Sequence, residues 1–211
     1  MKYIFNKQRV LFQGDSVTDC GRDRCDCGSL GNGYVKRAAD IYNSLCPDSG
    51  TVFLNRGVSG NRVRDVLARY AADILELKPD ALSILIGIND VWRRYDSGDP
   101  TAEDTFTGGY RELLSFIKRD LPETKIIMMD PFLLHVLPGQ NAWREDLEPK
   151  IQAVRELAGE FADIYIPLDG LLARFAVQGV PARDIAEDGV HPTDYGHALI
   201  AREWLRHVGV I

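Results

Sequence analysis

Residues 9–18 of the chain read Arg9-Val-Leu-Phe-Gln-Gly-Asp-Ser-Val-Thr18 and join a predicted strand to a polar turn. Val10–Gln13 is a largely apolar β-type run, typical of a parallel strand that is covered on both faces, and it passes directly into Gly14-Asp15-Ser16. In open α/β sheets, ligands bind outside the carboxyl ends of the strands, so a serine on this turn can point its hydroxyl into a crevice. For the tripeptide alone, a turn that bonds only its local backbone is the better interpretation.

The same alternation of strand and helix patterns continues along the chain. Further strands are predicted at Thr51–Asn55, Ala81–Ile86, Lys125–Met129 and Ile164–Pro167. Helical spacing of apolar residues runs from Val63 to Leu77, from Tyr110 to Ile117 and from Leu147 to Phe161. A last helix is predicted from Thr193, as its cap, to about His207. The pattern indicates a doubly wound α/β fold, and we expect residues 1–211 to form one domain because no linker or repeat interrupts it.

Charge and hydropathy exclude several classes of protein. The net charge of −6 argues against a nucleic-acid partner. The N-terminal stretch MKYIFNKQRVLFQGDS has polar residues within its apolar part and no small-residue cleavage site, so we expect no signal peptide. The longest apolar run, from Ala81 to Ile88, is far shorter than the ~20 residues that span a bilayer, so no membrane association is expected. A cytoplasmic protein with reduced thiols follows from these expectations.

Two further motifs follow predicted strands. After the second strand, Gly60 can offer an unhindered backbone N–H, although a tight turn is the better interpretation for this glycine taken alone. The third strand ends in Gly87-Ile88-Asn89-Asp90, where the Asn89 amide can face an oxyanion. Such a preorganised donor contributes about 2.7–4 kcal/mol to transition-state stabilisation. A helix N-cap is the competing interpretation for Asn89.

Near the C-terminus, Asp188-Gly-Val-His191 has the spacing of a catalytic pair. A carboxylate three residues before a histidine can accept the Nδ1–H and leave Nε2 free to take a serine proton. Taken alone, a solvated loop carboxylate beside an incidental histidine is an equally good interpretation. The four motifs together, three of them at predicted strand ends, indicate a serine hydrolase. The order Ser…Asp…His also occurs in α/β-hydrolases, but their G-x-S-x-G elbow is absent.

These blocks resemble the hallmark blocks of the GDSL, or SGNH, hydrolases over essentially the whole chain. The resemblance implies a three-layer α/β/α sandwich with a five-stranded parallel sheet of flavodoxin-like order. It implies Ser16 as nucleophile, Asp188 and His191 as orienter and base, and no cofactor. It also implies an oxyanion hole made by the N–H groups of Ser16 and Gly60 and the side chain of Asn89.

The segments GDSVTDCGR, LGNGYV, GVSGNRVRD, IGINDVWRRYD and DGVHPTDYGH are similar to the intracellular acetylxylan esterases of Gram-positive bacteria. This similarity implies a small-molecule ester substrate, an acetylated xylo-oligosaccharide. A lysophospholipase or acyl-thioesterase for longer acyl chains is an alternative, as is a non-catalytic flavodoxin-like module that binds nucleotide or flavin. The sequence leaves open whether the chain forms a homo-oligomer.

Asp15, Trp92 and Tyr95 are candidate substrate contacts, because polar groups and aromatic rings near Asn89 suit a sugar, whereas helix packing explains Trp92 equally well. Cys20, Cys25 and Cys27 invite a zinc interpretation, but no second pair of ligands follows, so no metal is expected. The Cys25-Asp26-Cys27 stretch also departs from the acetylxylan esterases. His135, His197 and His207 lack the Asp-x-x-His context, so we expect them to be structural or solvated.

Overall fold

The computed structural model describes residues 5–211, so the first four residues of the N-terminal stretch, for which no signal peptide is expected, lie outside the described residues. One sheet has the strand order β2-β1-β3-β4-β5, and all its pairings are parallel. Its strands are β1 (Arg9–Gly14), β2 (Val52–Asn55), β3 (Ala81–Leu85), β4 (Lys125–Met129) and β5 (Ile164–Ile166). The predicted five-stranded parallel α/β fold is therefore confirmed.

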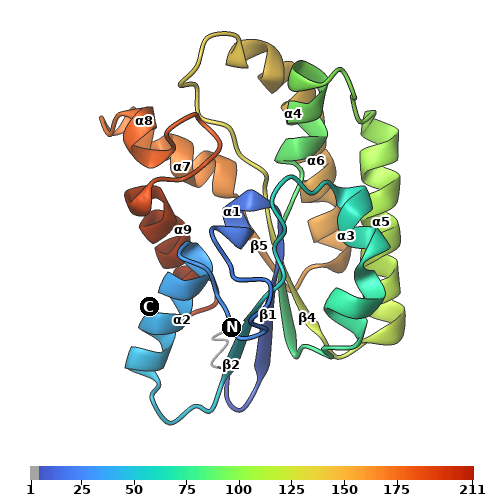
Figure 1. The fold of residues 1–211 in the computed structure, drawn as a ribbon, viewed down its shortest axis with the longest axis vertical. Helices are drawn as coiled ribbons and strands as arrows, with labels where there is room; N and C mark the ends of the chain where they lie inside the picture. Colours follow the sequence, from blue (N-terminus) through green and yellow to red (C-terminus); the bar gives the residue numbers. More distant parts are fainter. Residues whose placement is uncertain (1–4) are drawn as a thin grey trace.

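Helices cover both faces of the sheet, and each face has its own apolar cluster (Figure 1). One face carries α2 (Tyr34–Leu45), α7 (Leu168–Val177) and α9 (Asp194–His207). The other carries α3 (Val63–Ala68), α5 (Glu103–Asp120) and α6 (Gln140–Phe161). Neighbouring residues of β1 point to opposite faces, since Phe12 joins the first cluster and Leu11 the second. This arrangement explains why the strands read as continuous apolar runs.

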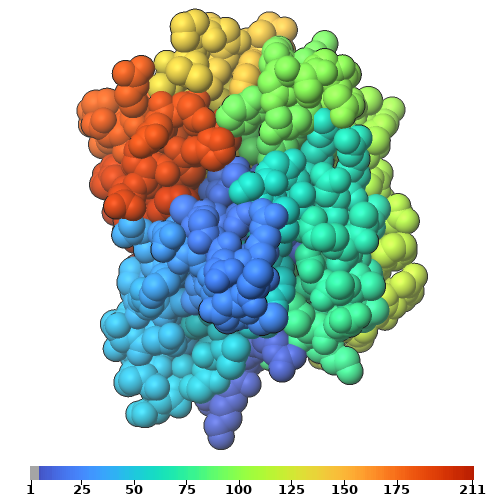
Figure 2. All heavy atoms as spheres, viewed as in Figure 1, coloured from blue at the N-terminus to red at the C-terminus, as the bar shows by residue number. Residues whose placement is uncertain are grey.

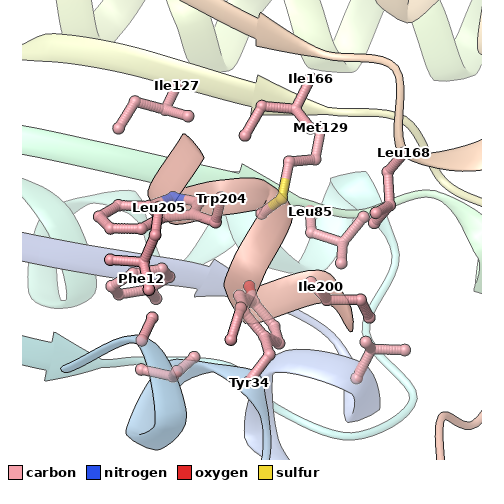
Figure 3. Packing of buried hydrophobic residues seen from close by; sticks show 14 of the residues in the cluster. Phe12, Tyr34, Leu85, Ile127, Met129, Ile166, Leu168, Ile200, Trp204 and Leu205 are labelled. Carbon is pink, nitrogen blue, oxygen red and sulfur yellow. The ribbon is translucent and has the colours of Figure 1, made fainter. Parts of the chain in front are cut away.

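Trp204 of α9 anchors the first cluster. Figure 3 shows Trp204 and Leu205 packed among Phe12, Ile127 and Met129 of the sheet. The indole is fully buried, and its Nε1–H donates a 3.0 Å hydrogen bond to Ser83 Oγ, so its polar atom is satisfied. Burying an aromatic side chain of this size stabilises the fold by about 5 kcal/mol before the entropy of ordering is subtracted.

One predicted helix is divided in the structure. Instead of a continuous helix from Val63 to Leu77, α3 ends at Ala68 and a π-helical turn, η1, spans Ala71–Leu75. Tyr70 lies at the junction, is buried, and places its hydroxyl 2.9 Å from Asp120 Oδ2 of α5. The wider turn is a local change that the apolar spacing does not reveal.

Three short helices complete the carboxyl edge of the sheet: α1 (Ser16–Asp19), α4 (Ile88–Asp96) and α8 (Ala182–Ile185). The last helix begins as predicted, because Thr193 caps α9 by accepting a 3.1 Å hydrogen bond from the Gly196 N–H. Within residues 5–211, no helix is long and apolar enough to cross a membrane.

Candidate active site

The predicted site residues lie at the carboxyl edge of the sheet. Ser16 follows β1, Gly60 follows β2 and Asn89 follows β3, while the loop between α8 and α9 carries Asp188 and His191. Figure 2 shows the corresponding blue, teal, green and orange-red segments meeting on one face of the molecule. The parallel topology thus gathers motifs that are far apart in the sequence.

Gly14 and Asp15 determine where Ser16 lies. A Cβ on Gly14 would lie 2.2 Å from the Leu85 carbonyl oxygen, so only glycine lets the chain pass this close to β3. The Asp15 side chain caps α1 by accepting a 3.0 Å hydrogen bond from the Val17 N–H. As a result, Ser16 starts α1 half-buried at the end of β1.

A continuous chain of hydrogen bonds joins Ser16, His191 and Asp188. Ser16 Oγ lies 3.0 Å from His191 Nε2, although the two residues are 175 positions apart. His191 Nδ1 lies 2.7 Å from Asp188 Oδ2. The other carboxylate oxygen, Asp188 Oδ1, accepts the backbone N–H groups of Val190 at 2.9 Å and His191 at 2.7 Å. The structure therefore brings together the three residues that the sequence predicted as a triad.

The electrostatics of this pair favour an anionic Asp188 beside a basic His191. Partial burial tends to raise the pKa of Asp188, but the hydrogen bonds from the His191 ring and two backbone N–H groups outweigh it and lower the pKa to about 2. The hydrogen bond to Asp188 raises the pKa of His191 above its ordinary value, against the opposing effect of burial. An ionised Asp188 holds the proton on Nδ1, which leaves Nε2 as the base that faces Ser16.

Gln140, which the sequence did not single out, ties this loop to α6. The Gln140 side chain is buried, and its Nε2 donates a 2.5 Å hydrogen bond to the Asp188 carbonyl oxygen. Gly189 docks the same loop on the segment after β4, because its carbonyl accepts a 2.9 Å bond from the Leu134 N–H. A Cβ on Gly189 would lie 2.1 Å from the Leu134 oxygen, and the residue has a φ of +88°, so only glycine fits.

The candidate oxyanion donors Asn89 and Gly60 lie in segments that hydrogen bonds connect to each other and to α1. Asn89 is buried in the first turn of α4, and its Nδ2 donates a 3.0 Å hydrogen bond to the Asn61 carbonyl. On the other side of Gly60, the Ser59 N–H donates a 2.9 Å bond to Asp19 Oδ2 at the end of α1. Gly60 itself is exposed. Its neighbour Ser59 is hydrogen-bonded to α1, and its other neighbour, Asn61, is hydrogen-bonded to α4.

Three aromatic rings form a surface beside His191, which we call the aromatic rim: Trp92, Tyr95 and Trp143. The Trp92 ring centroid lies 5.4 Å from His191 and 5.2 Å from Trp143. Tyr95 stacks on Trp143 with centroids 5.2 Å apart and an interplanar angle of 16°. Trp143 belongs to α6 and was not predicted, because nothing in its own sequence segment relates it to Asn89.

Asp15, predicted as a substrate contact, is buried next to Ser16. Its side chain is only 1% exposed, because Oδ1 is engaged with the Val17 N–H and the carboxyl group points into the protein. Burial raises the pKa of Asp15 to about 7, and the hydrogen bond from Val17 and the charge of His191 only partly oppose it. Asp15 is therefore a buried helix cap that lies outside the aromatic rim and lines a small cavity next to Ser16.

Cys20 and His197 contact each other, whereas Cys25 and Cys27 lie on the surface. Cys20 Sγ lies 3.2 Å from His197 Nε2, and His197 Nδ1 accepts a 3.1 Å hydrogen bond from the Tyr34 N–H. Burial lowers the pKa of His197 to about 4, so this ring is neutral near pH 7. Cys25 and Cys27 are exposed free thiols. Residues 5–211 contain no group of three or more His, Cys, Asp or Glu side chains placed to hold a metal ion.

Comparison with known proteins agrees with the fold and the motifs. The model of the GDSL-like lipase/acylhydrolase family matches residues 12–199. An acetylxylan esterase of Geobacillus stearothermophilus is 36% identical over 212 residues, which cover 98% of this chain and 96% of that protein.

Solved structures extend the same similarity to three dimensions. A crystal structure described as a GDSL-like lipase from Parabacteroides merdae matches with a TM-score of 0.94 and 35% identity over 100% of both chains. The crystal structure of the Geobacillus esterase matches with a TM-score of 0.89 and 33% identity over 98% of this chain and 96% of that chain. From its family model, its relatives and its fold, this chain belongs to the GDSL-like lipase/acylhydrolase family.

Proposed function

We propose that this chain is a serine esterase that removes acetyl groups from the hydroxyls of xylo-oligosaccharides, with Ser16, His191 and Asp188 as its triad. The observation that carries the proposal is the unbroken hydrogen-bond chain from Ser16 Oγ through His191 to Asp188. The similar Geobacillus protein is named an acetylxylan esterase. Its variants described as catalytic mutants replace a serine, an aspartate and a histidine three positions after that aspartate, which is the spacing of Asp188 and His191.

In the first half of the proposed reaction, His191 Nε2 takes the Ser16 proton while Oγ attacks the acetyl carbonyl carbon. The carbonyl oxygen gains negative charge and faces the N–H groups of Ser16, Gly60 and Asn89. The bond from the carbonyl carbon to the sugar oxygen then breaks, and the sugar oxygen takes the proton from His191. This step releases the free sugar hydroxyl and leaves an acetyl ester on Ser16.

In the second half, water gives a proton to His191 Nε2 and attacks the acetyl carbon on Ser16. The bond to Ser16 Oγ breaks, acetate leaves, and the proton on His191 returns to Oγ. Asp188 stays ionised throughout, in agreement with its pKa of about 2, and stabilises the imidazolium that forms in each half.

Two features on either side of the triad support an acetyl group on a sugar. On the alcohol side, the aromatic rim offers flat apolar faces next to His191, which suit the C–H faces of sugar rings. On the acyl side, a small cavity of about 10 Å³ is bordered by the residues next to Ser16 and His191. Its lining residues are Asp15, Val17, Leu85, Ile86, Ile88, Pro131, Phe132 and Val190. A cavity of this size holds one group about as large as a methyl or a water.

The test is acetate release from acetylated xylobiose by the wild-type chain and by Ser16→Ala. We expect Ser16→Ala to lose turnover down to what binding and the oxyanion donors supply without a nucleophile. A fluorophosphonate probe should label Ser16 in the wild-type protein and fail to label the variant. Labelling of Ser59 or Ser83, with activity retained in Ser16→Ala, would refute the assignment.

A further inference from the structure

The Asn89 amide can serve as an oxyanion donor only if its nitrogen, not its oxygen, faces the substrate. In the structure, the amide is held at both ends: Nδ2 donates to the Asn61 carbonyl at 3.0 Å, and Oδ1 accepts from Arg93 Nη2 at 3.2 Å. We propose that Arg93 is a positioning residue for the oxyanion hole, acting through Asn89. The inference rests on the proposed serine esterase function.

The two hydrogen bonds define one orientation of the amide. If the amide were rotated by 180°, Oδ1 would face the Asn61 oxygen and the NH₂ group would face the Arg93 guanidinium. Both contacts would then pair like with like, and both hydrogen bonds would be lost. In the observed orientation, one Nδ2–H bonds Asn61 and the second remains for the oxyanion.

Arg93 also makes Asn89 a better donor. A hydrogen bond from a charged guanidinium to Oδ1 is stronger than a neutral one and polarises the amide, which makes the Nδ2–H groups more positive. The effect grows as the substrate excludes water from the site, because the local dielectric constant falls. Arg93 should therefore matter more in the transition state, where negative charge develops, than in the ground state.

Arg93 is itself held in place by its own helix. It lies one turn after Asn89 on α4, a spacing at which side chains meet. Its Nη1 forms an ion pair with Asp96, and its guanidinium carbon lies 5.9 Å from the centroid of the Trp92 ring. A planar guanidinium can direct one nitrogen at Asp96 and another at Asn89 at the same time.

A double-mutant cycle on p-nitrophenyl acetate tests the proposal. We expect Arg93→Met to lower kcat about 10-fold with KM changed less than about twofold, the effect of losing one charge-assisted hydrogen bond. Asn89→Ala should lower kcat about 10²–10³-fold. In the Asn89→Ala background, Arg93→Met should lower kcat by less than about twofold, because the amide that it orients is gone.

The matched control is Arg94→Met, the next residue of the same helix, whose guanidinium approaches Asp146 of α6 at 3.7 Å. We expect its kcat to stay within about twofold of wild type. Equal losses from Arg93→Met in both backgrounds would overturn the proposal, as would a rise in KM at constant kcat. Unchanged turnover in Asn89→Ala would instead count against the oxyanion hole of the proposed function. Melting curves of each variant show whether any loss comes from unfolding, and Arg93→Leu, which also has no N–H donor, repeats the cycle if Arg93→Met does not fold.

Discussion

At the scale of single residues, Asp188 decides which nitrogen of His191 carries the proton. Asp188→Asn removes the charge that holds the proton on Nδ1, so kcat should fall by about 10⁴-fold. Wild-type kcat/KM should fall as the pH drops through a pKa above the ordinary histidine value of ~6.5, because imidazolium cannot accept the serine proton. In the variant, the midpoint should move to lower pH. Profiles of kcat/KM between pH 5 and 9 measure both effects, and wild-type activity in Asp188→Asn would refute the dyad.

The buried carboxyl group of Asp15 should make the free energy of unfolding depend on pH. Its pKa of about 7 in the folded protein exceeds the ~3.9 of an unfolded aspartate, so the folded state binds more protons between these values. The carboxyl group therefore lowers the free energy of unfolding increasingly as the pH rises from ~4 to ~7. Asp15→Asn keeps an acceptor for the Val17 N–H but has no charge to bury.

The melting temperature of Asp15→Asn, relative to wild type, should therefore rise between pH 5 and pH 8. Asp48→Asn, at an exposed carboxylate, is the matched control and should show no such trend. A relative melting temperature that falls over this range would mean that the Asp15 charge is stabilised in the fold, contrary to the burial argument.

Which site residues the sequence could reveal depends on whether they form contiguous motifs. Ser16, Asn89 and the Asp188–His191 pair each stand in a short pattern whose chemistry can be recognised locally. Gln140 and Arg93 have no such pattern: Gln140 acts on a carbonyl 48 positions away, and Arg93 resembles any surface arginine on a helix. Their roles follow only from contacts that the fold creates.

At the scale of elements, α6 shows where periodicity failed. The apolar spacing predicted a helical segment that begins at Leu147. Pro149 argues against a helix that begins much earlier, because a proline in the interior of a helix removes an internal hydrogen bond. The structure nevertheless starts α6 at Gln140, with Pro149 inside it. Trp143 lies in this additional N-terminal part, which explains why Trp92 and Tyr95 were the only aromatic residues among the predicted substrate contacts. The strands were predicted well because burial on both faces makes their apolar runs continuous.

Trp143, in the N-terminal part of α6, should contribute to sugar binding but not to the chemical step. Trp143→Ala should raise KM for acetylated xylobiose on the order of 10-fold, because a sugar would lose the ring surface that Trp143 adds to the aromatic rim. For p-nitrophenyl acetate, which carries no sugar, kcat and KM should change little. Trp143→Phe keeps an aromatic face and should recover most of the loss. Equal losses of kcat/KM on both substrates would show that Trp143 does not bind the sugar and instead supports the triad by packing against Trp92.

At the scale of the whole molecule, the site exists only where both halves of the fold meet. Ser16 comes from the first strand, Asn89 from the middle of the sheet, and His191 from a loop on the side of α9, far along the chain. The small cavity beside Ser16 is bordered likewise by α1, β3, the segment after β4 and the loop before His191. Its size is therefore a property of the packed fold, which no local motif specifies.

With the acyl group placed in this small cavity, as proposed, we expect a strong preference for short acyl groups. A buried CH₂ contributes about 0.8 kcal/mol to binding when space exists for it, but a cavity of about 10 Å³ offers none beyond a methyl group. Longer chains must displace well-packed walls, which typically costs ~1–3 kcal/mol. We expect kcat/KM on p-nitrophenyl esters to fall at least about 10-fold from acetate to butyrate and to approach background for octanoate and palmitate.

Val190 lines this cavity, so a substitution there should change the preference for short acyl groups. Its side chain is buried against the cavity, and its backbone N–H, which bonds Asp188, is kept in any substitution except proline. Val190→Ala should raise kcat/KM for butyrate relative to acetate, because the removed methyl groups enlarge the acyl side of the site. Val177→Ala, at a side chain 87% exposed on α7, is the control and should leave the ratio unchanged. A wild-type optimum at eight carbons or more, without acetate release from the sugar, would instead favour a lysophospholipase or thioesterase.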